Sequence, residues 1–236
     1  MPARERVLFL HSMIQSSTLT FFRQLRKNNH KTWFDAHRAQ YEAARKNIED
    51  FLQAVIDKHG KKDPDIAGLT AKSCLYRINR DIRFSKDKTP YKTHQAAGIT
   101  KGGKKSPLAG YYVHIEPDGK TMVAGGIWMP EAANLKKIRQ EIDYCYDDFN
   151  KIVTAKKFVN QFGGLYRGED VSLVKGPQGF EKDNPAAEYL KFKSWLASRE
   201  FSDADVTSKD FLKKVTDAFE TMQPFLQFLN RPLEHD

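Results

Sequence analysis

The stretch that decides the fold is residues 108–129, LAGYYVHIEPDGKTMVAGGIWM. On both sides of the Pro-Asp-Gly sequence at 117–119, apolar side chains recur with the period of two that is typical of a β-strand. Proline presets φ for a turn and glycine supplies a positive φ, so residues 117–119 indicate a tight connection. The stretch therefore predicts two antiparallel strands, 108–116 and 120–129, joined by a hairpin turn.

The segments on either side of this hairpin indicate helices and further short strands. Apolar residues recur every three or four positions over 16–28 and 32–59, which is the spacing of an amphipathic helix. More helices are expected over 130–147, onward to 162, over 185–190 and from a capping box at Thr207 and Asp210 to the C-terminus. Strands are expected at 74–79, 94–100 and 193–201. Because the strands cluster centrally without regular βα alternation, we predict an α+β fold. It would be a single domain over 13–236 with a mainly antiparallel central sheet, flanked by N-terminal and C-terminal helices.

The first twelve residues fit poorly with the helical pattern that follows them. We expect residues 1–12 to be a flexible leader and treat Met13 as a candidate start. The apolar run at 7–10 is shorter than the roughly 7–15 residues of a secretory signal. No apolar run approaches the about 18 residues that a membrane-spanning helix needs. We therefore predict a cytoplasmic protein that does not bind membranes.

The chain is basic, with 39 Lys and Arg against 30 Asp and Glu, and the excess is local. Residues 72–105 hold ten basic and two acidic side chains, whereas the other 202 residues hold 29 basic and 28 acidic ones. Aromatic residues are interspersed among these cations and add flat faces beside them. Cations with aromatic faces beside them are typical of surfaces that bind a nucleotide or a single-stranded nucleic acid.

Within this segment, residues 77–94 read RINRDIRFSKDKTPYKTH. Its three arginines lie within seven positions, where they repel one another and cannot lose their protons, so they need an anion. A carboxylate or phosphate fits, because a guanidinium binds it through two charge-assisted hydrogen bonds. We predict an anion-binding pocket whose ligand-binding residues are Arg77, Arg80, Arg83, Lys88 and Tyr91.

Acids and histidines near the arginines are the candidate catalytic residues. Asp81 and Asp87 lie among cations, which should lower the pKa of each carboxyl and keep it ionised. Ionised carboxylates are better suited to orienting the arginines than to donating protons. His94 or His114 would serve as a general base if it faced the arginines. The catalytic set is therefore Asp81, Asp87 and His94.

Two other motifs are weak. Residues 98–104 have most of the glycine spacing of a phosphate-binding P-loop, but Lys105 stands where Ser or Thr should bind magnesium, and a strand replaces the required helix. His30, Asp35 and His37 could be assembled into a metal site, yet a lone histidine on an amphipathic helix is more often a hydrogen-bonded structural residue. We predict no metal ligands, and the sequence identifies no cofactor.

The arginine motif also resembles the signature of a family. This is a bacterial and fungal family of conserved hypothetical proteins, domain of unknown function 2461, which the motif resembles in the order Arg77, Arg80-Asp81, Arg83-Phe84, Asp87-Lys88 and Tyr91. Trp33-Phe34 with Tyr41, the hairpin at Tyr112 and the helix at Pro185 extend the resemblance to about 13–229. The resemblance implies a single domain of this size and importance for the motif, and it implies no reaction.

Three functions are therefore open. The favoured one is a pocket that binds an anionic small molecule, with catalysis as an open extension. The first alternative is nucleic-acid binding through residues 72–105, which include Lys101, Lys104 and Lys105, and it predicts affinity that falls steeply with salt. The second is a structural or protein-interaction role in which the motif is an internal ion-pair brace. The sequence names no substrate and no protein partner.

Overall fold

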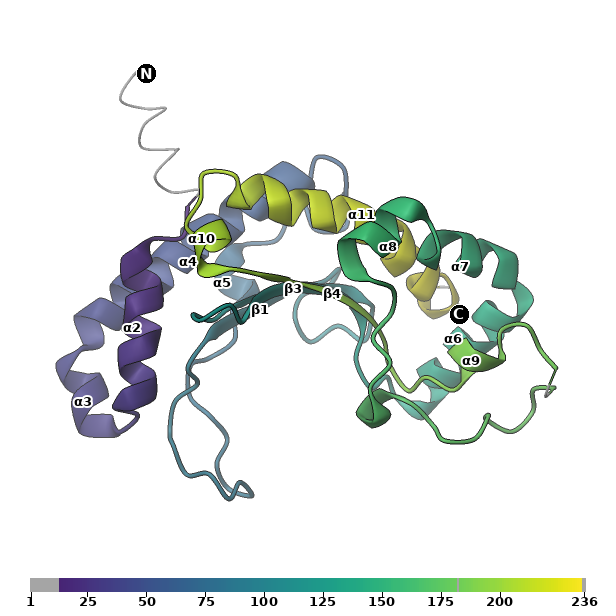
Figure 1. Cartoon of the computed structure of the whole chain (residues 1–236), viewed down its shortest axis with the longest axis horizontal. Coiled ribbons are helices and arrows are strands. Elements are labelled where there is room, and N and C mark those ends of the chain that lie inside the picture. The colour runs from purple at the N-terminus through teal and green to yellow at the C-terminus, as the bar shows by residue number, and fades with distance from the viewer. Residues whose placement is uncertain (1–12, 182, 235–236) are drawn as a thin grey trace. The chain divides into compact units, whose positions relative to one another are not determined.

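The computed structural model describes residues 13–181 and 183–234, so the leader predicted for 1–12 lies outside the described residues. In chain order the elements, most of them labelled in Figure 1, are α2 (Ser16–Lys27), α3 (Lys31–Ala36), α4 (Arg38–His59), α5 (Ala71–Cys74), β1 (Gln95–Ile99), β2 (Gly110–Ile115), β3 (Thr121–Ile127), α6 (Ala132–Tyr144), α7 (Tyr146–Val153), α8 (Lys156–Phe162), the 3-10 helix η1 (Glu169–Val171), α9 (Ala187–Leu190), β4 (Trp195–Phe201), α10 (Asp203–Val206) and α11 (Phe211–Glu234).

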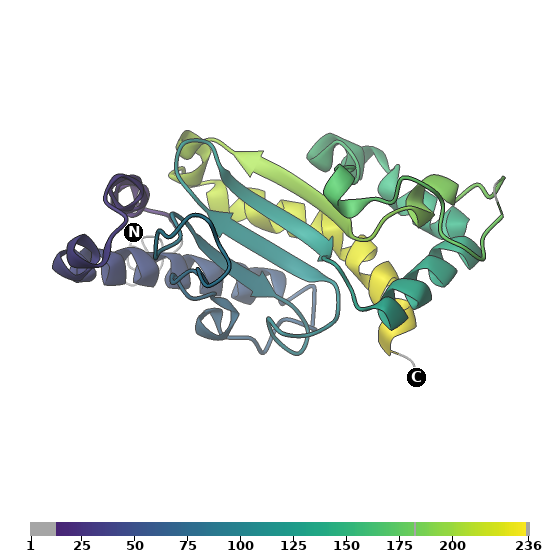
Figure 2. The same ribbon diagram turned by 90° about the horizontal axis from the view of Figure 1, so that it is seen from below.

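The four strands form one antiparallel sheet in the order β1-β2-β3-β4, whose strands are seen side by side in Figure 2. The predicted α+β class is thus confirmed. None of the described helices combines the length and apolar character that crossing a bilayer requires.

The hairpin predicted from residues 108–129 is also confirmed, as β2 and β3. At its turn Asp118 and Gly119 have φ values of 67° and 74°. Two backbone N–H groups of the turn, those of Asp118 and Gly119, donate to the carboxylate of Asp203 over 3.0 and 3.1 Å. Arg23 of α2 also binds the carboxylates of Asp118 and Asp203. The turn is therefore held by a helix on one side and by the start of α10 on the other.

The chain divides into two compact units. The first comprises the described residues up to Ile99, with Tyr112–Val123 and Glu200–Asp217, and the second comprises Thr100–Tyr111, Ala124–Arg199 and the described residues from Ala218 onward. By these bounds β2, β3, β4 and α11 each contribute residues to both units. The single domain expected over 13–236 stays a prediction.

The core of the first unit is aromatic. Phe22 and Leu25 of α2 are fully buried, as is Phe51 of α4. Phe51 stacks on Phe211 with ring centroids 5.0 Å apart, and Phe201 meets the edge of Phe211 at 5.3 Å. Burying each of these rings removes enough apolar surface to stabilise the unit by about 1.5–3 kcal/mol. Apolar residues spaced three or four positions apart on α2 and α4 thus supply buried side chains to this core.

The second unit has its own core. Phe149 of α7 packs near Phe225 and Phe228 of α11, and Phe158 of α8 meets the edge of Phe225 at 5.7 Å. All four rings are almost fully buried. Helix α11 continues through Pro224 without a restart.

Three local predictions were wrong or too broad. The helix expected over 32–59 is two helices, because His37 has φ −112° and ψ 20° and separates α3 from α4. The capping box lies at Ser202 and Asp205, where it opens α10, and not at Thr207 and Asp210. The strand expected at 74–79 forms only two isolated bridges, from Leu75 to Ala97 of β1 and from Asn79 to Tyr91.

Candidate metal centre

Strand β2 separates core residues from polar ones by simple alternation. Tyr111, Val113 and Ile115 are buried, whereas Tyr112 and His114 lie on the other face of the strand and are partly exposed. Glu116, directly after the strand, continues the polar series. Since side chains two positions apart share a face, the hairpin places Tyr112, His114 and Glu116 in a row.

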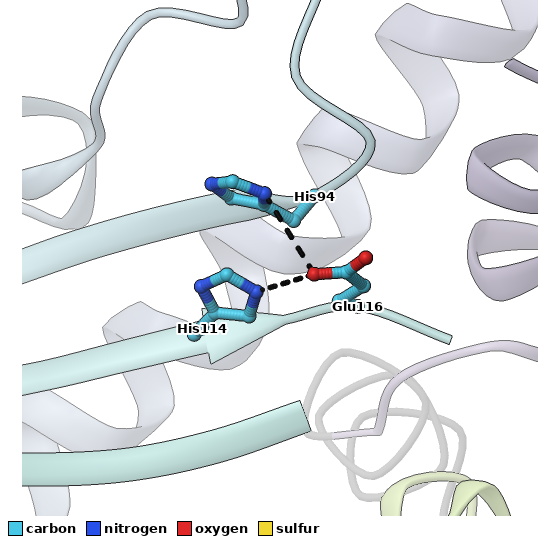
Figure 3. Close-up of side chains that lie close together, drawn as sticks. All are labelled: His94, His114 and Glu116. Carbon is cyan, nitrogen blue, oxygen red and sulfur yellow. Dashed lines mark hydrogen bonds and ion pairs between the residues drawn. The ribbon is translucent and has the colours of Figure 1, made fainter. Parts of the chain in front are cut away.

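His94 lies beside this row. It is the residue just before β1, and β1 is the strand that pairs with β2. Its imidazole stacks on that of His114, with ring centroids 4.1 Å apart and an interplanar angle of 28°. Figure 3 shows both rings beside the Glu116 carboxylate. Two neighbouring strands thus bring together residues twenty positions apart in the sequence.

The carboxylate of Glu116 is the centre of this cluster. Its Oε2 lies 2.8 Å from Nε2 of His114 and 3.8 Å from Nδ1 of His94 (Figure 3). Its Oε1 accepts hydrogen bonds from Arg26 of α2 over 3.0 Å and from Thr93 over 3.4 Å. The two oxygens therefore have different roles, since one is anchored by surrounding donors and the other faces the imidazoles.

Tyr112 completes the surroundings of His114. Its hydroxyl lies 3.1 Å from Nδ1 of His114, so both ring nitrogens of this histidine have a partner. Burial raises the pKa of Tyr112 to about 12, and the nearby Tyr76 and Glu116 add to this rise. The phenol is therefore neutral at physiological pH and can donate to Nδ1 or accept from it.

Burial also sets the protonation of the ligand groups. It lowers the pKa of His94 to about 4, with the neighbouring Lys92 acting in the same direction and Glu116 opposing it. Burial alone would raise the pKa of Glu116, but the hydrogen bond from His114 and the nearby Arg26 outweigh it and lower that pKa. At neutral pH the cluster thus contains a neutral His94 and an ionised Glu116.

This arrangement fits a transition-metal ion. One ligand atom from each of His94, His114 and Glu116 can be chosen so that all three lie within 4.8 Å of one another, and this is the one such group in the described part of the chain. Two ligands of one zinc ion, each about 2.0–2.1 Å from it, lie about 3.4 Å apart at the tetrahedral angle. The contacts of 2.8 and 3.8 Å to Glu116 Oε2 are on either side of that spacing.

The hydrogen bonds that a metal ligand makes to neighbouring side chains usually fix its ring orientation and tautomer. With a metal at Nε2 of His114, the ring proton would be carried on Nδ1 and donated to the hydroxyl oxygen of Tyr112. Arg26 and Thr93 hold Oε1 of Glu116 and leave Oε2 directed at the imidazoles. The residues required to orient both ligands are therefore present.

The predicted arginine motif lies elsewhere, on an irregular hairpin that isolated bridges close at Leu75–Ala97 and Asn79–Tyr91. Arg80 binds Asp87 over 2.5 Å and donates to the carbonyl and hydroxyl oxygens of Thr89. This guanidinium is an internal brace of the loop.

The other residues of the motif are spread over the same hairpin. Arg83 pairs with Asp81 over 2.7 Å, with the arginine side chain 76% exposed. No hydrogen bond or ion pair within the described residues links this pair to that of Arg80 and Asp87. Lys88 donates to the carbonyl of Ile82 over 3.0 Å.

The pKa values of the two aspartates shift in the predicted direction. The Arg83 guanidinium lowers the pKa of Asp81, and hydrogen bonds from Thr89, followed by one from Arg80, lower that of Asp87. Both carboxyls stay ionised and hold arginines. Tyr91 is buried and stacks on Phe34 with ring centroids 4.0 Å apart, so its ring is part of the core beside α3.

The residues weighed at His30, Asp35 and His37 have other partners. His37 stacks on Trp33 at 4.0 Å between centroids, and its Nδ1 contacts the Trp33 carbonyl. His30 accepts from the backbone of Trp33 as an N-cap, and Asp35 pairs with Lys31 and Arg38. Each of the three side chains is thus held by a different set of neighbours.

A family model for a conserved hypothetical protein (DUF2461) matches residues 17–228. The chain belongs to this family. The match covers most of the chain and confirms the family that residues 77–91 resemble. No match was found among curated proteins or among solved structures.

Within this DUF2461 chain, sequence reasoning named His94 and considered His114 but missed Glu116. A histidine and a glutamate two positions apart on a strand share a face, and this signal was available in the sequence. The pairing of β1 with β2 could not be read from the sequence, because it depends on the register between two segments separated by a ten-residue connection. Without that register, His94 could not be assigned to the row of His114 and Glu116.

Proposed function

We propose that the chain binds one divalent transition-metal ion through His94, His114 and Glu116 and acts as a metal-dependent enzyme. The observation that carries this proposal is the convergence of two imidazoles on one carboxylate oxygen, on a partly exposed face of the sheet. Side-chain exposures of 26% for His94 and 13% for both His114 and Glu116 leave the cluster accessible to an ion.

The number of ligands favours a catalytic site over a structural one. Structural zinc sites are closed by four protein ligands, whereas catalytic sites keep three and leave a position for water or substrate. Two histidines and one carboxylate form such an open set, and imidazole with carboxylate suits zinc and iron(II) in particular. A metal bound here would act as a Lewis acid that polarises a substrate oxygen or activates water.

The residues around the ligands have defined parts in this function. Arg26 and Thr93 orient Glu116, and Tyr112 orients His114. Stacking of the two imidazoles places their ligand nitrogens on the same side of the carboxylate (Figure 3). The anionic small molecule expected from the sequence remains a proposal.

Isothermal titration of Zn²⁺ into EDTA-treated protein tests the proposed centre. We expect one ion per chain, with affinity at least about 100-fold lower in His94→Ala, His114→Ala and Glu116→Gln, because each removes a ligand. His30→Ala is the matched control, since His30 is an exposed histidine on another element, and its affinity should equal that of wild type. Absence of binding to wild type, or equal binding by all variants, would overturn the proposal.

A further inference from the structure

Two cations lie beside the candidate metal centre on the strand-like segments that form the base of the irregular hairpin. Lys92 precedes His94 by two residues. Its ammonium donates to the carbonyl of Arg77 over 3.0 Å and lies 5.9 Å from the centroid of the Tyr76 ring. The segments that carry Arg77 and Lys92 also pair through their backbones, since Tyr76 donates to the carbonyl of Ala96 and Lys92 to that of Ile78, each over 2.9 Å.

Lys92 and Arg77 differ from Arg80 and Arg83, because neither of them has an acidic partner among the described residues. Arg80 and Arg83 are each paired with an aspartate. Among the described residues, no carboxylate lies within ion-pair distance of Lys92 or Arg77. Asp81, whose charge interacts with that of Arg77, is held by Arg83 instead. Two cations on paired segments without an acidic partner are a site that an anion stabilises.

The aromatic side chains connect this pair to the metal ligands. Tyr76 lies under the Lys92 ammonium, and its backbone N–H donates to the carbonyl of Ala96 in β1. Strand β1 pairs with β2, which carries Tyr112 and His114. Tyr76 is 37% exposed, so the surface between the cations and the ligands is not closed. A bound molecule could therefore reach both the cations and an ion on the histidines.

We propose that Arg77 and Lys92 form an oxyanion-binding subsite beside the metal centre, so that the substrate of this centre carries a phosphate or carboxylate group. This inference rests on the proposed metal-dependent function. It narrows the anion-binding residues of the sequence motif to Arg77 and adds Lys92, which the motif did not include. Phosphate and carboxylate share the geometry that guanidinium and ammonium donors recognise.

Titration of inorganic phosphate, and separately of acetate, distinguishes the two sources of the oxyanion. Each probe is titrated into protein loaded with one equivalent of Zn²⁺ and into EDTA-treated protein. Lys92→Met and Arg77→Met keep much of the apolar stem and remove the charge. Lys86→Met is the matched control, because Lys86 is an exposed lysine of the same hairpin.

We expect zinc-loaded wild type to bind at least one of the two oxyanions. The affinity should fall about tenfold in Lys92→Met and in Arg77→Met, since each removes a charge-assisted hydrogen bond. It should stay at the wild-type value in Lys86→Met, and the affinity for Zn²⁺ should be unchanged in all three variants. The oxyanion with the higher affinity identifies the group carried by the substrate.

The results distinguish failure of the oxyanion subsite from failure of the proposed metal-dependent function. If wild type binds Zn²⁺ but neither oxyanion, or if both Met variants bind the oxyanion as wild type does, the subsite is overturned and the metal centre stands. If wild type binds no Zn²⁺, the proposed function fails and the substrate class fails with it. Salt-sensitive binding of a single-stranded oligonucleotide that persists in both Met variants would overturn the subsite in favour of the nucleic-acid alternative.

Discussion

Glu116 uses its two carboxylate oxygens differently, and this difference defines the candidate site at the scale of single residues. Oε1 accepts from Arg26 and Thr93, and Oε2 faces both imidazoles. Arg26 also binds Asp118 in the hairpin turn over 2.8 Å, so the guanidinium is fixed at two points. An arginine held in this way orients the carboxylate without touching the ion.

Replacing Arg26 should therefore weaken metal binding without removing a ligand. We expect Arg26→Gln to lower the affinity for Zn²⁺ about 10- to 100-fold, the usual cost of losing an orienting partner of a metal ligand. Lys27→Gln removes the same charge from the exposed adjacent position and should leave the affinity unchanged. Calorimetric titration of both variants measures the difference, and equal affinities would show that Arg26 has no orienting role.

The two paired arginines of the sequence motif should differ in their effect on stability. Arg80→Ala removes hydrogen bonds to Thr89 and should lower the free energy of unfolding by about 1–3 kcal/mol. Arg83→Ala removes a solvent-exposed pair and should change the melting temperature much less. Thermal melts of the two variants test this order, and a larger loss in Arg83→Ala would contradict it.

At the scale of elements, the hairpin of β2 and β3 explains how far the sequence could predict the fold. Alternation and the Pro-Asp-Gly turn are local signals, and both strands were predicted from them. The division of 32–59 into α3 and α4 was not predicted. The His37 ring stacks on Trp33 and contacts the Trp33 carbonyl, and these interactions compete with a continuous helix. Local periodicity does not register such a contact.

Close packing of β3 against β4 predicts a severe effect of one substitution. A Cβ at Gly126, whose φ is 134°, would lie 1.9 Å from the carbonyl oxygen of Trp195. We expect Gly126→Ala to lower the free energy of unfolding by at least about 3 kcal/mol, because neither backbone can move without breaking the ladder.

Gly119 is the matched control for this steric argument. It also has a positive φ, of 74°, but a Cβ there would meet nothing within 4 Å. Gly119→Ala should cost only about 1–2 kcal/mol of left-handed strain. Chemical denaturation of both variants compares the two costs, and equal losses would show that the contact with Trp195 is not the cause.

The capping box of α10 predicts a dependence on pH. The hydrogen bond from Lys214, followed by that from Ser202, lowers the pKa of Asp205. Its carboxylate therefore stabilises the fold above its unfolded pKa of about 4, and this contribution is lost as the pH falls through the lower folded value.

Asp205→Asn should accordingly melt at a lower temperature than wild type at pH 7, and the gap should narrow as the pH falls below about 4. Asp210→Asn, at the position where the sequence predicted the cap, should melt close to wild type throughout. Thermal melts across this pH range provide the measurement. A gap for Asp205→Asn that stays constant with pH would contradict the assigned role of its charge.

At the scale of the whole molecule, the candidate site is assembled from segments far apart in the chain. Arg26 comes from α2, Thr93 and His94 from the segment before β1, and Glu116 from the end of β2. Residue chemistry identified the basic hairpin and His94, whereas the strand pairing that unites His94 with Glu116 is a tertiary property. The family match shows that the chain belongs to DUF2461 over residues 17–228. The proposed metal chemistry rests on the pairing of β1 with β2 and not on that match.

The most direct test of the metal centre is X-ray absorption on protein loaded with one equivalent of Zn²⁺. We predict a first shell of nitrogen and oxygen at about 2.0–2.2 Å, with the outer-shell scattering of two imidazoles, and loss of that imidazole signal in a His94→Ala/His114→Ala double variant. A spectrum without imidazole scattering, or one that the double substitution leaves unchanged, would contradict the central claim.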